Sequence, residues 1–399
     1  MGVNEVSSNI RRGVIPRATT GISEHLDEIY TQHGFFGQWV HLFRSRNVGF
    51  PKTWSSDDVM YKGTDTTTLA PADQTDAAGS PMELLRGDGI VVSLSRRSQP
   101  MPFAELNADY HQIRFYHRGE FLIETELGRF EVEPGDFAVI PKGLVYRETP
   151  RQADGNAVLI FETAEPAEPA EELWDNAGFA SFFTDYSAMK LPEPVGEIRN
   201  VETEVRLKFR GEIHTLTYDF DPCSDVIGWV GDPVVFSLNV WDIPGLGSSH
   251  GFLPPPSGAV LMGRDKSFFF NVMSPKPFPN VPAPDGSIGA PAHMNDYEEV
   301  WFNHVADAAP HTDGHLWRLP PSIPHPGIKR PPFYPEGPVE RIREMKINFD
   351  CRAGLTWTDA ARKALMPDPQ IGLYTSLAGT HIGVVPDEAS RYAAGRLPE

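Results

Sequence analysis

Cysteine is the scarcest feature of this sequence, with only Cys223 and Cys351 among 399 residues. Two cysteines are too few for a disulfide scaffold or for a zinc cluster built from cysteine. Long hydrophobic runs are missing as well. None approaches the ~20 residues of a membrane-spanning helix, and the first residues lack the apolar segment of a secretory signal. We therefore expect a cytoplasmic protein that makes no contact with a membrane.

Basic residues are also few. Lysine and arginine total 35 against 54 aspartate and glutamate residues, which gives a formal net charge of -19. Such an acidic surface repels phosphate backbones, so nucleic acid is not an expected partner. Hydrophobic residues nevertheless make up 40% of the chain, which is enough for a sizeable core. At ~150 residues per domain, the length suggests two domains.

Helix-forming stretches are sparse, because 38 prolines and 35 glycines are spread along the chain. The short β-rich runs between them predict an antiparallel sandwich or barrel. The clearest runs are 89–94, 121–132, 136–140, 157–163, 234–243, 267–273 and 345–349. Run 121–132 is expected to be a hairpin that turns at Leu127 and Gly128. The best helix is 358–366, with Thr358 as its N-cap, and short helices are possible at 24–32 and 169–177.

Residues 128–147 read GRFEVEPGDFAVIPKGLVYR and resemble the second half of a cupin, a small double-stranded β-helix. A metal-binding cupin has a histidine about three residues after the Pro-x-Gly turn, where this chain has Leu144, Val145 and Tyr146. Upstream, His111 and His117 share one strand face by alternation, but no carboxylate and third ligand accompany them. We therefore expect this first cupin to hold no metal.

Residues 292–302 read AHMNDYEEVWF and offer a better constellation. His293 and Glu299 are separated by five residues, and His325 follows where a neighbouring strand would return. Two histidines and a carboxylate form the facial triad that holds Fe(II) and leaves positions open for substrate and O2. The spacing alone leaves a second interpretation open, because any of the 13 histidines is more often an ordinary surface or core residue than a ligand.

Taken together, these segments resemble the homogentisate 1,2-dioxygenase family, in particular its shorter bacterial members. The resemblance also includes GVIPR at 13–17, DVIGWVGDPVVFSLNVWDI at 225–243 and PPP at 254–256. The family's His-x-Asn-x3-Glu pattern matches residues 293–299, and its last ligand, a histidine before Gly-Pro, corresponds to His325 before Pro-Gly. The resemblance implies an all-β bicupin of two double-stranded β-helix (jelly-roll) domains with few short helices. It also implies Fe(II) held by His293, Glu299 and His325 in the C-terminal domain.

The resemblance further implies an enzyme, a homo-oligomer that uses O2 to cleave the ring of a small aromatic substrate in aromatic catabolism. Homogentisate-, gentisate- and catechol-like hydroxylated aromatics are the expected class. At two positions this chain departs from the family's sequence, and these departures argue against assigning homogentisate itself as the substrate. The family's Trp-His pair, which supplies a base, corresponds to Trp229 and Val230, and a second family histidine corresponds to Leu319. An aliphatic side chain cannot donate or accept a proton, so neither residue can act as the base. His250 is the candidate for a replacement base. The alternative interpretation is that His250 is an ordinary loop histidine.

We expect five segments. They are an N-terminal arm at 1–60, a cupin-like domain without metal at 61–163, a linker at 164–174, a cupin domain with the metal site at 175–350, and a helical or irregular tail at 351–399. Two alternatives stay open. One is a metal-dependent cupin enzyme that does not use O2, such as an isomerase, hydrolase or decarboxylase, and the other is a non-catalytic cupin binder. Ligand type alone does not separate Fe(II) from Mn(II).

Overall fold

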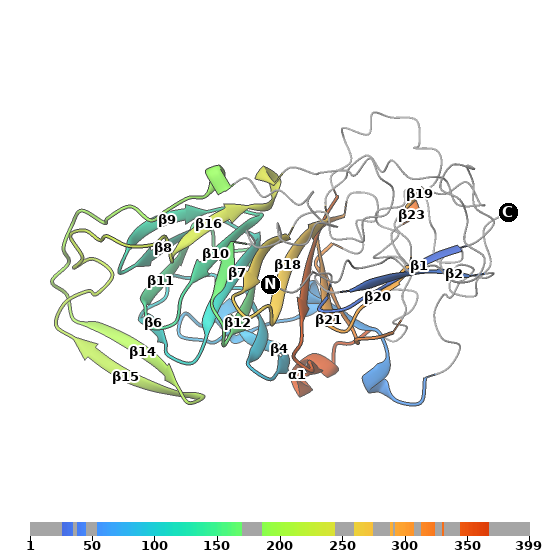
Figure 1. Ribbon diagram of the computed structural model, residues 1–399. Helices are drawn as coiled ribbons and strands as arrows, with labels where there is room; N and C mark the ends of the chain where they lie inside the picture. Colours follow the sequence, from blue (N-terminus) through green and yellow to red (C-terminus); the bar gives the residue numbers. More distant parts are fainter. Residues whose placement is uncertain are drawn as a thin grey trace, which may run out of the picture.

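The computed structural model describes residues 26–34, 38–44, 54–169, 186–243, 259–273, 288–289, 292–306, 313–323, 329–330 and 344–366. Strands dominate this part of the chain (Figure 1). Its only α-helix is α1 (Asp359–Arg362), and 3-10 turns lie at Asp57–Val59, Thr66–Thr68, Ala72–Gln74, Tyr186–Ala188 and Val240–Asp242. Among the described residues, no helix is long and apolar enough to cross a membrane.

Two sheets form the N-terminal half of the fold. The N-terminal central sheet has the order β16 (Phe236–Asn239), β10 (Asp136–Ile140), β7 (His111–Arg118), β12 (Ala157–Thr163), β5 (Ile90–Ser95), β4 (Met82–Gly87) and β25 (Thr356–Trp357). The outer sheet has the order β15 (Glu212–Tyr218), β14 (Thr203–Phe209), β6 (Ala104–Asn107), β11 (Val145–Pro150), β8 (Phe121–Thr125) and β9 (Gly128–Val132). Apolar side chains of both sheets, such as Phe121 and Val158, form one core between them.

The C-terminal central sheet has the order β13 (Ala167–Pro169), β17 (Ala259–Gly263), β18 (Phe268–Met273), β24 (Glu344–Cys351), β21 (Glu298–Ala306), β22 (His315–Leu319) and β3 (Lys62–Asp65). It packs on the N-terminal central sheet through the largest apolar core. In that core Phe270 contacts Phe137 and Phe161. Two small sheets complete the fold: β2 (Trp39–Arg44), β1 (Leu26–Thr31) and β20 (Ala292–Met294) form one, and β19 (Ile288–Gly289) and β23 (Lys329–Arg330) form the other.

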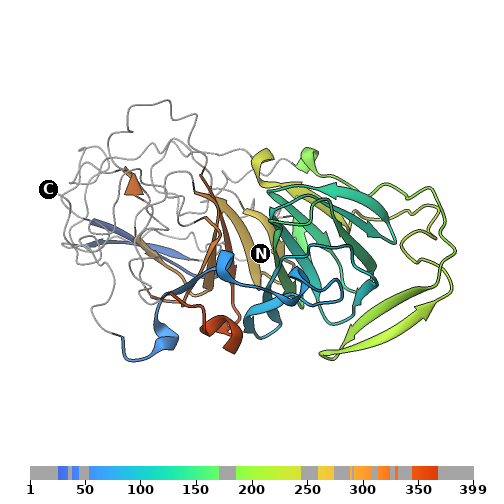
Figure 2. The same cartoon turned by 180° about the vertical axis from the view of Figure 1, so that it is seen from behind.

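Three sheets therefore lie in layers, as Figures 1 and 2 show from opposite sides. The described part of the chain has an all-β, bicupin fold with few short helices, and the expected fold class is confirmed. The expected hairpin is confirmed as well, because β8 and β9 pair antiparallel from Phe121 opposite Val132 to Thr125 opposite Gly128. Its turn is at Glu126 and Leu127, one residue earlier than expected, and Gly128 already belongs to β9. The expected N-cap is also present, since Thr358 Oγ accepts a hydrogen bond from the Ala361 N–H at the start of α1.

One of the two expected short helices is wrong. Residues 26–31 form β1 instead of a helix, since β1 pairs with β2 on one side and with β20 on the other. Hydrogen bonding to these neighbouring strands outweighs the weak local helix propensity. The other helix, expected at 169–177, stays a prediction. Its first residue, Pro169, ends β13, and the rest of that stretch lies outside the described residues.

The sheets exchange strands across the expected segment boundaries. β3, near the start of the first expected domain, is an edge strand of the C-terminal central sheet. β14, β15 and β16 lie after the expected linker, yet they belong to the N-terminal sheets. β25 returns from the expected C-terminal tail to pair with β4. The five-segment division stays a prediction, because sheet membership alone does not define a folding unit.

Candidate metal centre

The C-terminal central sheet has one apolar face and one polar face. Along β24, Met345, Ile347 and Phe349 belong to the apolar core, while Lys346 and Asn348 point to the opposite side by strand alternation. The cross-strand pairs extend this second side to the neighbouring strands. We call it the polar face; its members are Asn271, Glu299, Trp301, Asn303, Trp317, Lys346, Asn348 and Asp350. All are buried, so these polar groups sit in a low-dielectric setting.

Glu299 lies near the start of β21 on this face and is 2% exposed. Asn295 Nδ2 donates to its Oε1 at 2.8 Å, and Trp301 Nε1 donates to its Oε2 at 2.8 Å. Both contacts hold the carboxylate in one orientation. A carboxylate oxygen has two lone pairs and can accept more than one contact, including one to a cation. The chemistry of this buried anion therefore fits a metal ligand.

Asp350 lies directly opposite Glu299 in the antiparallel pair of β24 and β21. Asn271 Nδ2 and Asn348 Nδ2 both donate to its Oδ2, at 2.8 and 3.0 Å, while its buried Oδ1 has no hydrogen-bond partner. Burial raises the pKa of Asp350 well above its usual value, and the negative charge of Glu299 raises it further. Two adjacent buried carboxyl groups favour a positive group between or beside them.

Glu298, the neighbour of Glu299 in the chain, points to the other side of the sheet. There Arg318 Nε and Nη2 donate to its two carboxylate oxygens at 2.9 and 2.8 Å. This buried bidentate ion pair satisfies the Glu298 charge. The two adjacent glutamates thus have different environments, and only Glu299 faces the polar side.

The other expected site residues are only partly within the described chain. His293 is the central residue of β20, opposite Ile29 of β1 in a parallel pair. Its side chain lies outside the described part, as do His325 and His250 as whole residues. Among the described residues no three histidine, cysteine or acidic side chains are arranged so that they could hold a metal ion. The triad of His293, Glu299 and His325 and the role of His250 therefore stay predictions.

The N-terminal arm reaches the start of this site. Its β1 lies beside β20, and the turn after β1 is tied to the segment between β20 and β21. Gly34 N–H donates to Asp296 Oδ1 at 3.0 Å, and a Cβ at Gly34 would lie 2.4 Å from the Phe269 ring. The described residues 26–34 of the arm therefore lie against their own chain.

The sequence reasoning missed Asp350 and its two asparagine partners. A signal was present, because residues 345–350 read MKINFD and alternate strictly between apolar and polar side chains. Such alternation is typical of a strand with one apolar face. In this sheet the polar side chains are buried too, as Lys346 and Asp350 are both 0% exposed.

The two positions that depart from the family lie in different surroundings. Leu319 is 1% exposed and sits opposite Glu299 across β22 and β21, on the polar face. Val230 is fully exposed, in the loop between β15 and β16. The position opposite the candidate metal ligand is therefore occupied by an aliphatic side chain that exchanges no proton.

His111 and His117 both lie on β7, but neither faces the interior of the N-terminal barrel. His117 Nδ1 lies 3.0 Å from His304 Nδ1 of the C-terminal central sheet. His111 Nδ1 accepts a hydrogen bond from the Lys142 N–H at 3.4 Å, and burial lowers its pKa to about 4. Strand alternation instead directs Arg114 and Tyr116 towards the barrel interior.

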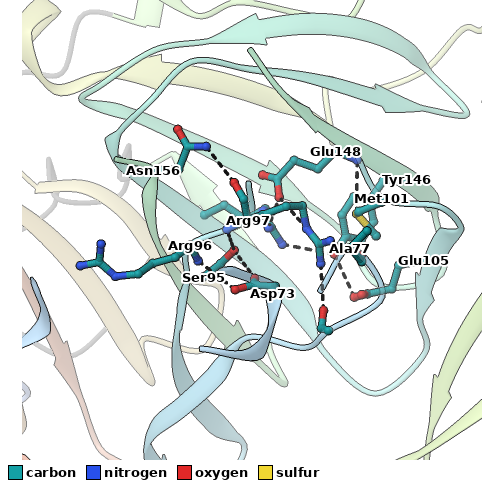
Figure 3. A network of polar contacts seen from close by, with 12 residues as sticks. Asp73, Ala77, Ser95, Arg96, Arg97, Met101, Glu105, Tyr146, Glu148 and Asn156 are labelled. Carbon is teal, nitrogen blue, oxygen red and sulfur yellow. Dashed lines mark hydrogen bonds and ion pairs between the residues drawn. The ribbon is translucent and has the colours of Figure 1, made fainter. Parts of the chain in front are cut away.

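A polar network fills that interior (Figure 3). Arg114 Nη2 and Tyr116 OH donate to the Glu148 carboxylate at 2.9 and 2.7 Å. Tyr146, at the position where a metal-binding cupin has its histidine, donates to Glu105 at 2.9 Å and accepts from Arg114. Arg97 approaches Glu148 at 4.0 Å. The guanidinium of Arg114 already balances the negative charge of Glu148 in this interior. That this domain holds no metal stays a prediction.

Several known proteins are similar to this chain. The family model described as homogentisate 1,2-dioxygenase N-terminal matches residues 82–240. A protein of Saccharolobus solfataricus named as a candidate dioxygenase is 25% identical over 60% of this chain and 64% of its own length. Homogentisate 1,2-dioxygenase of Sinorhizobium medicae is 26% identical over 46% of this chain, and that of Pseudomonas putida F1 is 28% identical over 47%.

The matched segments span 36% and 44% of those two enzymes, so the chain covers less than half of the length of each. Among solved structures, a cupin barrel protein of Leptotrichia buccalis has a TM-score of 0.35 and 12% identity, over 73% of this chain and 96% of that one. A mutant of Bacillus subtilis oxalate decarboxylase has a TM-score of 0.36 and 10% identity, over 77% and 81%. On the match at residues 82–240 and the named relatives, the chain is similar to the homogentisate 1,2-dioxygenase family.

Proposed function

We propose that the chain is a non-haem Fe(II) dioxygenase that cleaves the ring of a small hydroxylated aromatic substrate with O2. His293, Glu299 and His325 would be the metal ligands, and the enzyme would act in the cytoplasm in the catabolism of aromatic compounds. The observation that carries the proposal is the Glu299 carboxylate. It is buried on a polar face and is held in one orientation by Asn295 and Trp301.

The ligand set suits this chemistry. Two histidines and one carboxylate bind Fe(II) on one face and leave about three positions for substrate and O2. Bound Fe(II) would supply a Lewis acid that lowers the pKa of a coordinated hydroxyl group, together with a place for O2. Asn295 and Trp301 would keep the Glu299 carboxylate in its binding orientation when substrate enters.

The substrate class follows from what the site lacks. Leu319 and Val230 stand where the family has histidines, and neither side chain can accept a proton. A substrate that binds through a hydroxyl group and an adjacent carboxylate or second hydroxyl depends least on a separate base, because the metal itself stabilises the anion. We therefore favour homogentisate-, gentisate- and catechol-like compounds as a class, with His250 as the residue to test for a replacement base.

The chain offers a matched pair of variants for the first test. Glu299→Gln removes the charge of the proposed ligand, whereas Glu298→Gln removes a buried charge of the same kind one residue earlier, on the opposite face. Elemental analysis of anaerobically purified protein should give about one iron per chain in the wild type and in Glu298→Gln. Iron should be lost in Glu299→Gln, His293→Ala and His325→Ala. An O2 electrode with a panel of dihydroxy and hydroxycarboxy aromatics then identifies the substrate.

The outcomes discriminate between the candidate functions. Equal iron in Glu299→Gln and the wild type contradicts the proposed site. The second candidate, a metal-dependent cupin enzyme that does not use O2, is favoured by Leu319 on the polar face beside Glu299. It would be supported by zinc or manganese at the same residues and by turnover without O2 uptake. Protein that stays metal-free after Fe(II) reconstitution would instead indicate a non-catalytic binder.

A further inference from the structure

The hairpin of β14 and β15 projects from the end of the outer sheet, as both views show (Figures 1 and 2). β15 is the edge strand of that sheet, and no described strand pairs with its other side. Its residues are exposed apart from Leu216 and Tyr218, which are half-buried against the small core around Val205 and Cys223. A seven-residue edge strand with open backbone groups is a template for pairing with another chain.

The hairpin turn determines which backbone groups are open. Arg210 and Gly211 both have positive φ, 54° and 76°, and connect Phe209 to its partner Glu212 in a two-residue turn. In such a turn the flanking pair exchanges both hydrogen bonds, and every second pair along the strands does the same. The N–H and C=O groups of Ile213, Thr215 and Thr217 therefore point away from β14 into the open edge.

From this geometry we infer that β15 pairs antiparallel with β15 of a second copy of the chain, about a two-fold axis at Thr215. Thr215 then faces Thr215 of the second copy, and Ile213 faces Thr217 of the second copy. This register satisfies the three open N–H groups on each copy. Pairs of β-branched side chains such as these stabilise antiparallel strands. The two outer sheets would join into one continuous sheet across the dimer.

The charge of the β14–β15 hairpin also favours a second copy of the chain as the partner of β15. In the same register Glu212 faces Tyr218 of the second copy, and His214 faces Leu216, so no like charges are opposed. Residues 203–218 carry three basic side chains, Arg206, Lys208 and Arg210, against Glu204 and Glu212, whereas the whole chain has a net charge of -19. Two copies that approach through this hairpin therefore meet at a part of the surface that is less acidic than the chain as a whole.

Exposed apolar side chains accompany the open edge. Ile213 is 61% exposed, and in the loop that follows β15 Ile227 is 88% exposed and Val230 is fully exposed. Edge strands that stay unpaired usually carry lysine, proline or a bulge. β15 has no lysine and no proline, and its pairing with β14 has no register shift. An edge without any of these devices is suited to a permanent partner.

Proline at position 215 tests the inference. The Thr215 N–H points away from β14, so Thr215→Pro removes a hydrogen bond of the proposed interface and none within the hairpin. Light scattering coupled to size-exclusion chromatography should give half the mass of the wild type for Thr215→Pro, with an unchanged circular dichroism spectrum. Thr215→Val keeps the N–H and should keep the wild-type mass.

A second test does not depend on that variant. In the proposed register the two Thr215 Cα atoms lie ~5.5 Å apart, which is within the range of a disulfide. Thr215→Cys should therefore form a covalent dimer on mild oxidation, since both native cysteines are buried. Glu212→Cys is the matched control, because its two copies would lie six residues apart along the strands, about 20 Å, and should not cross-link. A monomeric wild type, or equal cross-linking of both variants, would overturn the inference.

Discussion

His117 Nδ1 lies 3.0 Å from His304 Nδ1, and this contact joins the two central sheets across their apolar interface. Each histidine is the extra residue of a β-bulge. Pairing along β7 and β12 passes from Tyr116 to Arg118, and pairing along β21 and β24 passes from Asn303 to Val305. Bulges re-aim side chains, and here two of them bring polar rings together in a core flanked by Phe115 and Phe302.

The first prediction concerns acid. Burial lowers the pKa of His304 to about 3. The pKa of His117 is lowered by burial and, further, by His304, Arg118 and Arg96. Below the usual histidine pKa of ~6.5 the unfolded chain binds protons that the folded chain does not. The free energy of unfolding should therefore fall as the pH drops from 6.5 towards 3. His304 alone should account for ~2 kcal/mol of this loss at pH 5.

Chemical denaturation at pH 7 and pH 5 measures this loss. The double variant His117→Gln with His304→Gln should be less stable at pH 7 and should lose less stability on acidification than the wild type. His214→Gln replaces an exposed histidine and serves as the control. Its free energy of unfolding should fall between pH 7 and pH 5 by the same amount as that of the wild type. An unchanged difference between the two pH values in the double variant would show that other groups carry the acid sensitivity.

A second prediction concerns the N-terminal barrel. Glu148 is 0% exposed and accepts hydrogen bonds from Arg114 and Tyr116, so Glu148→Ala leaves a buried guanidinium without its counter-charge. Breaking such a pair typically costs ~3–5 kcal/mol. Glu131→Ala breaks the exposed ion pair with Arg151 and should cost less than ~1 kcal/mol. Urea titration of both variants measures the difference, and equal costs would contradict the structural role of the network.

The third prediction tests the packing under β3. A Cβ at Gly63 would lie 2.2 Å from the buried ring of Trp317, on the strand opposite. Gly63→Ala should therefore destabilise the chain by ~1–3 kcal/mol, because the indole must move within a close-packed region. Gly228→Ala has no neighbouring atom within 4 Å and should change the melting temperature little. A tolerated Gly63→Ala would mean that β3 is not held against β22 as described.

The fourth prediction concerns the groups that orient Glu299. Asn295→Ala removes the donor to Oε1, so metal affinity should fall ~10–100-fold even though the proposed ligands remain. Competition with a chelator measures this affinity without relying on turnover. Asn156→Ala removes a buried asparagine of the N-terminal half, where it donates to the Arg97 carbonyl, and should leave metal affinity unchanged. Equal affinity in both variants would mean that Asn295 does not position the carboxylate.

Local sequence signals predicted many of the elements. The runs at 136–140 and 157–163 coincide with β10 and β12, and Thr358 caps α1 as expected. The failure at 24–32 has a physical cause, since β1 exists only because β2 and β20 lie beside it. A six-residue segment with mixed polarity carries no local information about such partners.

The residues of the candidate site were also predictable from the sequence only in part. Motif spacing singled out Glu299, and the structure places its carboxylate on a buried polar face with two donors. Asp350 was not found, because its importance comes from lying opposite Glu299 in a strand 51 positions later in the chain. His293, His325 and His250 remain predictions from the sequence.

The sequence by itself determined the β-rich class, the short strands and the chemistry of the candidate ligands, because these depend on composition, alternation and spacing along the chain. Only the tertiary structure decided which strands join which sheet. The exchange of β3 and β16 between the halves, the pairing of Glu299 with Asp350 and the contact of His117 with His304 all depend on it. Each of these joins residues far apart in the sequence, and the free energy that selects them comes from burial and hydrogen bonding, which exist only once the sheets are packed.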